Sequence, residues 1–458
     1  MIRSVVVMCA ALGIGAAAGA TNWNDAHAAN PFLPGYFADP SIIEHEGRHY
    51  LYATIDPWGG ERLACWVSDD FRDWTYHELN WPTKTACASA ESSDAMVWAP
   101  SVVRGVDGRF YQYTSVGSEI WVGVAEHPLG PWSNALGDRP LVPRSFAPDY
   151  HMIDADVFID DDNRAYLYWG SGWNWVNGAC FAVELEPDMV TFRGEPKVVT
   201  PTNYFEGPTM LKHGGRYYLT YSSGKTTSDT YQVHYAIGKS PLGPFEEAPN
   251  SPILVTDHDR QVVSPGHHGF VRLGSAVYIA YHRHRVPFIE GTAYRQICLD
   301  QLRFDNDGLI QKIVPTHEGP AVIQRSAMPA PSTKSPPRVT ASGQASAETP
   351  PDAVFDNNYA TRWVSEAGSA AAWLQLDLGD VLEISESELR LEYPNRNYPL
   401  QLRTSKDGVT WSTPFRTFEE PTQGSPARIE HATSARYLRI DFAASGEEPV
   451  GVWEWRVR

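Results

Sequence analysis

One pattern of polar and apolar positions returns five times between residues 39 and 281. Each copy opens on a polar or small residue, runs through apolar positions, passes a polar turn and ends in an aromatic segment with tyrosine. Within a copy the opening residue and the tyrosine are 11 or 12 apart, and successive tyrosines are 61, 55, 52 and 60 apart. Such regularity indicates an internal repeat. The copies run from Asp39 to Tyr50, Ala99 to Tyr111, Asp154 to Tyr166, Glu206 to Tyr218 and His267 to Tyr278.

Each copy predicts two β-strands joined by a tight turn, because β-branched and aromatic runs flank dipeptides such as Asp107-Gly108 and Gly214-Gly215. Two further strand-like runs follow in the unit, as at 120–125 and 232–237. Four short strands per period are typical of a propeller blade, and five blades close a ring. We therefore predict an all-β fold with a five-bladed β-propeller over residues 30–325. A β-sandwich is the alternative, but it does not explain five near-equal periods.

The chain changes character after the repeats. Residues 326–338 are rich in Pro and Ser and predict a semi-rigid linker. Residues 339–458 predict a second β-rich unit of about 120 residues.

The first 28 residues predict a secretory signal peptide. Arg3 precedes an apolar stretch of small residues, and sites typical of cleavage follow Ala20 and Ala28. A membrane anchor is the alternative, but the stretch falls short of the roughly 20 residues that a spanning helix needs. We therefore expect a secreted or periplasmic protein. Four cysteines remain after cleavage, either as buried thiols or in disulfides: Cys65, Cys87, Cys180 and Cys298.

Composition narrows the class of partner. The formal net charge is -18 and no run of Lys or Arg occurs, so nucleic acid is not an expected partner. A mean hydropathy of -0.35 disfavours a membrane protein once the signal is removed. Aromatic residues make up 12% of the chain, which suits a neutral oligosaccharide or polysaccharide. We expect a monomer.

The repeat brings its polar residues together. The first strand of each blade lines the central channel, so the five opening residues of the copies meet at one end of it. Acidic residues are poor strand formers and costly to bury, so Asp39, Asp154 and Glu206 in register indicate a function. Hydrolysis of a glycosidic bond with inversion needs a carboxylate base and a carboxylic acid across a gap that admits water. The blade positions make Asp39 and Glu206 that pair, with Asp154 beside the acid, where its charge disfavours ionisation of Glu206.

Loops after the second strands return to the same end of the channel. They carry Trp58, Trp173 and Arg285, and we also expect Trp98, His267 and Arg295 to contact substrate. Indole faces pack on sugar rings, and guanidinium groups donate to hydroxyls.

Five motifs follow one another along residues 31 to about 320: Ala38-Asp39-Pro40-Ser41, Trp98-Ala99-Pro100-Ser101, Ile153-Asp154-Ala155-Asp156-Val157-Phe158, Glu206-Gly207-Pro208 and Gly266-His267. In this order and spacing they resemble glycoside hydrolase family 43, whose members are five-bladed propeller enzymes that invert configuration. The resemblance implies that Asp39 is the general base, Glu206 the acid and Asp154 the modulator of the acid. It implies no cofactor for the chemistry, and for His267 a place beside a calcium ion or a water cluster. Ala155 and Asp156 depart from the family pattern, so Asp156 is an alternative modulator, although strand register favours Asp154.

The family implies an α-L-arabinofuranosidase or a β-D-xylosidase acting on plant-type polysaccharides or oligosaccharides. A propeller that binds carbohydrate without cleaving it is the alternative. It leaves the three carboxyl groups in register unexplained.

The segment Asp356-Asn-Asn-Tyr-Ala-Thr361-Arg-Trp363, with Trp373 to Gly379, resembles the coagulation factor V/VIII type C, or discoidin-like, domain. This resemblance implies a carbohydrate-binding β-sandwich. It also implies a structural calcium ion at Asp356, Thr361 and Glu454. The alternative is a unit that only packs on the propeller.

Overall fold

The computed structural model describes residues 21–325, 336–368, 371–443 and 448–458. Its elements are β-strands, with three short 3-10 helices among the described residues, η1 (Arg144–Phe146), η2 (Trp173–Trp175) and η3 (Pro351–Phe355). The all-β prediction is therefore confirmed. Most of the predicted signal peptide and of the linker lies outside the described residues. None of the helices in the described ranges is long and apolar enough to cross a membrane.

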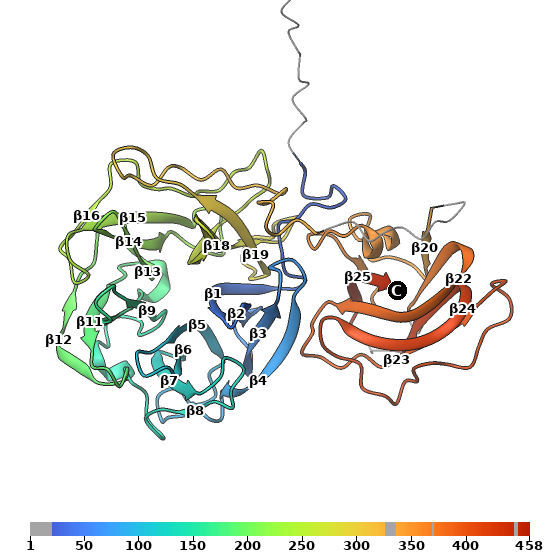
Figure 1. Cartoon of the computed structure of the whole chain (residues 1–458), viewed down its shortest axis with the longest axis horizontal. Coiled ribbons are helices and arrows are strands. Elements are labelled where there is room, and N and C mark those ends of the chain that lie inside the picture. Colours follow the sequence, from blue (N-terminus) through green and yellow to red (C-terminus); the bar gives the residue numbers. More distant parts are fainter. Residues whose placement is uncertain (1–20, 326–335, 369–370, 444–447) are drawn as a thin grey trace, which may run out of the picture.

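The repeat region folds into five antiparallel sheets arranged around a common centre (Figure 1). Four of them have four strands in chain order, the composition of a propeller blade, and the fifth has three. The first sheet is β1 (Phe37–His45), β2 (Arg48–Ile55), β3 (Arg62–Ser68) and β4 (Thr75–Thr83). The second is β5 (Val97–Arg104), β6 (Phe110–Val116), β7 (Glu119–Ala125) and β8 (Ser133–Asn134). The third is β9 (Asp156–Ile159), β10 (Ala165–Trp169), β11 (Phe181–Leu185) and β12 (Phe192–Val198).

The fourth sheet is β13 (Glu206–His213), β14 (Arg216–Ser223), β15 (Gln232–Gly238) and β16 (Phe245–Glu247), and the fifth is β17 (Gly266–Leu273), β18 (Ala276–His284) and β19 (Arg295–Leu302).

The segment before β1 lies along β19: the Phe32 amide donates to the carbonyl of Ile297 at 3.1 Å. The side chain of Asn30 donates to the carbonyl of Leu299 and accepts from its amide, both at 2.9 Å. The beginning of the repeat region is thereby tied to its end, and the first and fifth sheets share one apolar core.

The start of each inner strand carries the same backbone irregularity. Asp39, Ala99, Asp154, Gly207 and His267 all have positive φ, from 35° to 61°. Four of them are not glycine, and such residues cost of order 1–3 kcal/mol each, a cost that clusters at functional sites. The ladder pairing shifts at this point, between Ala38 and Ser41 in the first sheet and between Glu206 and Thr209 in the fourth.

This register corrects one detail of the sequence-based alignment. The residue equivalent to Asp39 in the fourth sheet is Gly207, and Glu206 is equivalent to Ala38. Glu206 therefore reaches the channel from one position earlier in the strand than the two aspartates. The Pro that follows both Asp39 and Gly207 marks the correct alignment.

The C-terminal unit is a β-sandwich, as predicted. Its strands are β20 (Arg338–Ala341), β21 (Trp363–Val364), β22 (Trp373–Leu391), β23 (Leu400–Ser405), β24 (Ala427–Phe442) and β25 (Gly451–Val457). The long strands β22 and β24 curve across the unit (Figure 1). They enclose an apolar core that includes Trp363 and Trp455.

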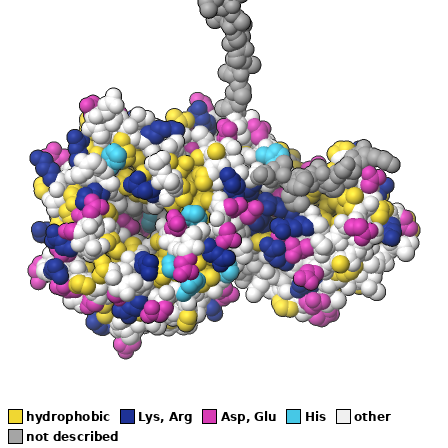
Figure 2. All heavy atoms as spheres, in the orientation of Figure 1, with side chains coloured by type: hydrophobic (Ala, Val, Ile, Leu, Met, Phe, Trp, Pro, Cys, Tyr) yellow, Lys and Arg dark blue, Asp and Glu magenta, His cyan; other side chains and the backbone are white. Residues whose placement is uncertain are grey.

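The sandwich contacts the first sheet of the repeat region directly. Arg456 pairs with Asp73 at 2.9 Å, and Arg390 donates to the carbonyl of Trp74 at 3.0 Å. Lys and Arg side chains gather where the two units meet (Figure 2). These contacts bury the arginine side chains, so the two units pack against each other and are not joined by the linker alone.

The four cysteines after the predicted signal, Cys65, Cys87, Cys180 and Cys298, are all buried free thiols. This outcome settles the choice that the sequence left open between thiols and disulfides.

Candidate active site

A cavity of about 250 Å³, which we call the pit, opens where the five inner strands begin. All three predicted catalytic carboxyl groups line it. They come from three different sheets, so only closure of the ring brings them together. The lining residues are Asp39, Trp58, Trp98, His151, Ile153, Asp154, Ser171, Gly172, Trp173, Asn174, Trp175, Phe205, Glu206, Thr226, His267 and Arg295.

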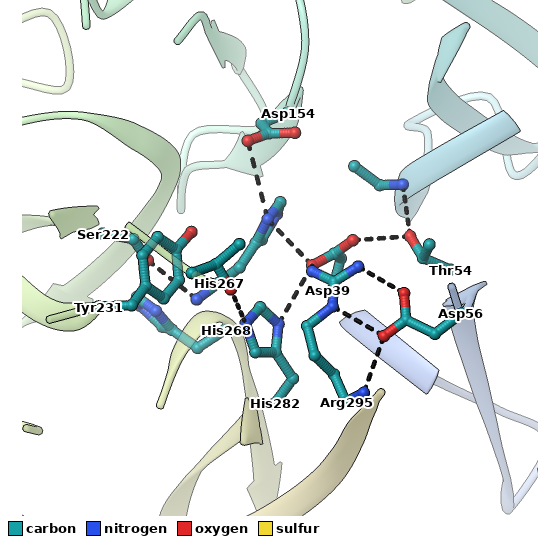
Figure 3. A network of polar contacts seen from close by, with 12 residues as sticks. Asp39, Thr54, Asp56, Asp154, Ser222, Tyr231, His267, His268, His282 and Arg295 are labelled. Atoms are coloured by element: carbon teal, nitrogen blue, oxygen red, sulfur yellow. Dashed lines mark hydrogen bonds and ion pairs between the residues drawn. The ribbon is translucent and has the colours of Figure 1, made fainter. Parts of the chain in front are cut away.

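Asp39 lies at the centre of a polar network (Figure 3). Its Oδ2 accepts a hydrogen bond from the Thr54 hydroxyl at 2.7 Å. Its Oδ1 accepts from Arg295 Nη1 at 3.1 Å and lies 3.2 Å from Nδ1 of both His267 and His282. Burial by itself would raise the pKa of Asp39, but Arg295 and the two imidazoles hold it well below its usual range. Asp39 is therefore an ionised carboxylate.

Arg295 is fixed by a second carboxylate. Its Nε and Nη2 donate to the two oxygens of Asp56 at 2.8 and 2.7 Å, which is the bidentate geometry that holds a guanidinium rigidly. The Arg295 backbone amide also donates to Asp56, at 2.9 Å. Arg295, which we expected to contact substrate, lines the pit. Its Nε, Nη1 and Nη2 atoms all donate to Asp39 or Asp56. Sequence reasoning missed Asp56, although it stands two residues before the predicted Trp58.

Glu206 is held by two hydroxyl groups that the sequence did not reveal. Ser171 donates to its Oε2 at 2.9 Å, and Tyr231 donates to its Oε1 at 2.7 Å. Burial raises the pKa of Glu206 to about 7, although both hydrogen bonds act to lower it. Glu206 therefore holds a proton at neutral pH far more readily than an ordinary glutamate does.

Asp154 is 4% exposed and faces both of the other carboxyl groups. Its Oδ2 lies 3.7 Å from Nδ1 of His267 (Figure 3). Burial, then the charges of Glu206 and Asp39, raise the pKa of Asp154 well above its usual value. Asp154 and Glu206 thus titrate as a pair, in which each charge disfavours ionisation of the other.

Asp156, the alternative modulator, lies elsewhere. Its carboxylate accepts hydrogen bonds from the Ser101 hydroxyl at 3.2 Å and the Met210 amide at 3.1 Å. It lines a neighbouring cavity of about 400 Å³ between the inner strands, which shares Asp39, Asp154 and His267 with the pit, and it does not line the pit itself. The geometry favours Asp154 as the group that faces the reaction site.

Aromatic side chains form the wall of the pit. Trp58, Trp98 and Trp173 all line it as expected, and Trp58 is 40% exposed. The ring of Trp173 stacks on His151 with centroids 4.2 Å apart, which fixes its orientation. Arg285 does not line the pit, because its guanidinium stacks on the ring of Tyr294 at 4.7 Å.

The predicted cation site in the sandwich brings the buried carboxyl group of Glu454 near the partly buried one of Asp356. Thr361 Oγ1 donates to Asp356 Oδ2 at 2.7 Å, and Glu454 Oε2 is buried without a hydrogen-bond partner. Burial raises the pKa of Asp356 to about 7, and burial with the charge of Asp356 raises that of Glu454 to about 8. An orphaned buried carboxylate oxygen fits a cation. Within the described ranges no group of three or more His, Cys, Asp or Glu side chains is arranged to hold a metal, at His267 or elsewhere.

A ring of sheets that presents paired carboxyl groups in an aromatic pit defines a glycoside hydrolase. Comparison with known proteins agrees: the chain belongs to the glycosyl hydrolases family 43, whose model matches residues 28–310. An F5/8 type C domain model matches residues 338–455. The chain is thus a glycoside hydrolase, and its family needs no cofactor for catalysis.

Individual relatives carry several sugar specificities. The chain is 33% identical over 318 residues to "Beta-D-galactofuranosidase xynD" of Aspergillus niger, covering 66% of this chain and 89% of that protein. It is 26% identical over 346 residues to "Arabinoxylan arabinofuranohydrolase" of Bacillus subtilis, covering 63% and 65%. A solved structure described as "Glycoside hydrolase" matches with a TM-score of 0.77 and 27% identity over 94% of this chain and all of that one.

Proposed function

We propose that this chain is an inverting glycoside hydrolase in which Asp39 is the general base and Glu206 the general acid. One observation carries the proposal: the pit holds two carboxyl groups whose pKa values are displaced in opposite directions. Arg295 and the imidazoles keep Asp39 ionised, whereas burial raises the pKa of Glu206 to about 7. A pair of carboxyl groups whose pKa values are pushed apart takes the base and acid roles.

In this mechanism the Asp39 carboxylate takes a proton from the water that attacks the anomeric carbon. Glu206 gives its proton to the departing glycosidic oxygen. Asp154 and Glu206 disfavour each other's ionisation, so the pair retains a proton more readily than either group would alone. The Thr54 hydroxyl and the Arg295 guanidinium each engage one oxygen of Asp39, which supports a base acting through water over a nucleophile attacking the sugar.

The stereochemistry of the product tests this mechanism. Proton NMR in the first minutes of hydrolysis reports the anomer released before mutarotation mixes the two. The inverted anomer is expected. A retained anomer would mean that a carboxylate attacks the sugar, and the base assignment would fall.

We propose a neutral furanose or pentose as the released sugar, in the first place an α-L-arabinofuranosyl or β-D-xylosyl unit of a plant polysaccharide. The relatives named arabinoxylan arabinofuranohydrolase and xylosidase/arabinosidase support this class, and the galactofuranosidase adds a furanose with a longer side chain. A panel of the three chromogenic glycosides ranks them by kcat/KM. Hydrolysis of none of the three would contradict the substrate class.

We propose further that the five sheets are the blades of a five-bladed propeller over residues 30–325, with a linker at 326–338 and the sandwich at 339–458. Residues 1–28 are proposed to direct export to the periplasm or the medium. The mass of the mature chain recovered from those fractions tests the export proposal. A full-length chain confined to the cytoplasm would contradict it.

We also propose that Asp356 and Glu454 hold a structural Ca²⁺ with the hydroxyl of Thr361 nearby. The orphaned Glu454 oxygen supports this assignment. The melting temperature should fall on addition of EDTA and recover with excess CaCl₂, and Glu454→Gln should abolish that response. If neither EDTA nor CaCl₂ changed the melting temperature of the unsubstituted chain, the proposed calcium site would be wrong.

A further inference from the structure

A third cavity, of about 340 Å³, lies beside the pit and is larger than it. We call it the side cavity. It is formed by three segments: the loop between β14 and β15, the segment before β17, and the loop between β18 and β19. None of its lining residues lines the pit, so it is a separate site.

One loop forms the partition between the two cavities. Thr226 lines the pit, and Asp229, three residues further along the same loop, lines the side cavity. The carbonyl of Thr226 accepts a hydrogen bond from the Ser264 hydroxyl at 3.1 Å, and that of Thr227 accepts from the Gly291 amide at 2.9 Å. The Thr256 hydroxyl donates to the carbonyl of Asp229 at 2.7 Å. The partition is thus held from both sides, and the side cavity is preformed.

The lining combines polar acceptors with an apolar floor. Asp229 and Glu290 supply carboxylates, and Gln261 supplies an amide. The imidazole of His258 lies 3.3 Å from the Asp229 carboxylate, and both side chains are more than half exposed, so both remain open to a ligand. Phe288 contributes an aromatic ring, which is held edge-on against His284 with centroids 4.9 Å apart.

Such a lining fits one class of ligand, a neutral sugar. Sugar hydroxyls donate to carboxylate and amide oxygens, and the C–H face of the ring packs on an aromatic side chain. Phosphates and uronic acids are excluded, because the cavity is lined by two carboxylates and by no Lys or Arg. The positive φ of Gln261, 55°, adds local strain of a kind that clusters at binding sites.

We propose that the side cavity is an accessory subsite that binds a neutral backbone sugar of the same polysaccharide whose terminal or branching sugar occupies the pit. This inference rests on the proposed function and specifies it: the enzyme acts on a polymer that it holds at two points. Binding at a second point beside the pit raises the local concentration of the scissile sugar. Its contribution therefore appears with polymer and not with a small glycoside.

The test compares Phe288→Ala with Ile289→Ala in the full chain. Ile289 is the next residue, is 45% exposed and does not line the side cavity, so it controls for loss of an apolar side chain from that loop. With arabinoxylan as substrate we expect Phe288→Ala to raise KM about tenfold, the equivalent of about 1.4 kcal/mol. The ratio of kcat/KM on a chromogenic arabinofuranoside to that on arabinoxylan should rise by the same factor. Ile289→Ala should change neither.

A second variant removes polar groups instead of the ring. The double variant Asp229→Asn/Glu290→Gln should raise KM for the polymer. It should also reduce the difference in KM between neutral xylan and xylan that carries uronic acids, because the two carboxylates that repel the acids are gone. Equal losses on the small glycoside and on the polymer would indicate a purely structural role and overturn the proposal. So would an unchanged polymer KM in both variants.

A binding measurement separates this proposal from the catalytic one. Calorimetric titration of xylohexaose into Glu206→Gln, with and without Phe288→Ala, measures affinity in a chain that does not turn over. At least a fivefold weaker Kd with Phe288→Ala supports the subsite even if the hydrolytic specificity proves different. Equal Kd values would reject the subsite and leave the catalytic assignment standing.

Discussion

Tyr231 and His282 stack with ring centroids 5.7 Å apart and planes 8° from parallel. Tyr231 donates to Glu206, and His282 lies against Asp39, so one aromatic pair supports both of the proposed catalytic carboxyl groups. The stack depends on a glycine, because a Cβ at Gly266 would lie 2.3 Å from the Tyr231 ring. Gly266 is therefore required for the Tyr231 ring to occupy this position.

Tyr231→Phe should move the basic limb of the pH profile to higher pH. The Tyr231 hydroxyl favours the ionised form of Glu206, so its loss raises the pKa of the acid above about 7. We also expect kcat to fall about tenfold, because a hydrogen bond to a charged group contributes roughly 1.5–3 kcal/mol. The profile of kcat/KM against pH checks the shift. Tyr221→Phe is the control, since its hydroxyl donates to the carbonyl of Thr202 and not to a carboxyl group.

Glu206→Gln and Asp39→Asn should each lower kcat by about 10²–10⁴-fold on an unactivated glycoside, the usual contribution of a general acid or base. A substrate with a very good leaving group needs no proton from the acid. Such a substrate should therefore restore much of the rate of Glu206→Gln and little of that of Asp39→Asn. Equal rescue of both variants would contradict the division of roles.

Asp154→Asn should move the basic limb to lower pH. Asp154 and Glu206 disfavour each other's ionisation, so replacing Asp154 by a group that cannot ionise lets Glu206 lose its proton at a lower pH. Activity that needs a protonated Glu206 is then lost at a lower pH. Asp156→Asn is the matched control, because its carboxyl group lies outside the pit. A shift in the control with none in Asp154→Asn would transfer the modulating role to Asp156.

A shortened chain ending at Arg325 should be less stable than the full chain and poorly soluble. It loses the partners of Tyr36 and Asp73, which contact Glu392 and Arg456 of the sandwich. Melting temperature and the soluble fraction measure the effect. An unchanged melting temperature would mean that the sandwich is an independent unit whose role is binding alone.

The sequence by itself determined the all-β class, the repeat and the two-part organisation. These follow from local rules, because the period-two alternation and the turn residues are properties of neighbouring positions. It also singled out Asp39, Asp154 and Glu206, since acidic residues at strand starts are costly without a function.

Only the tertiary structure decided how these groups are supported. Arg295 reaches Asp39 and Asp56 from across the ring, 256 and 239 residues away in sequence, and Tyr231 and Ser171 reach Glu206 from separate loops. No local pattern encodes such contacts, because closure of the ring creates them. The alignment of Glu206 is a different case, because Pro40 and Pro208 mark its offset by one residue in the sequence and the strand pairing shows the same offset. The charges that separate the pKa values of Asp39 and Glu206 likewise act through space, and their distances exist only in the folded chain.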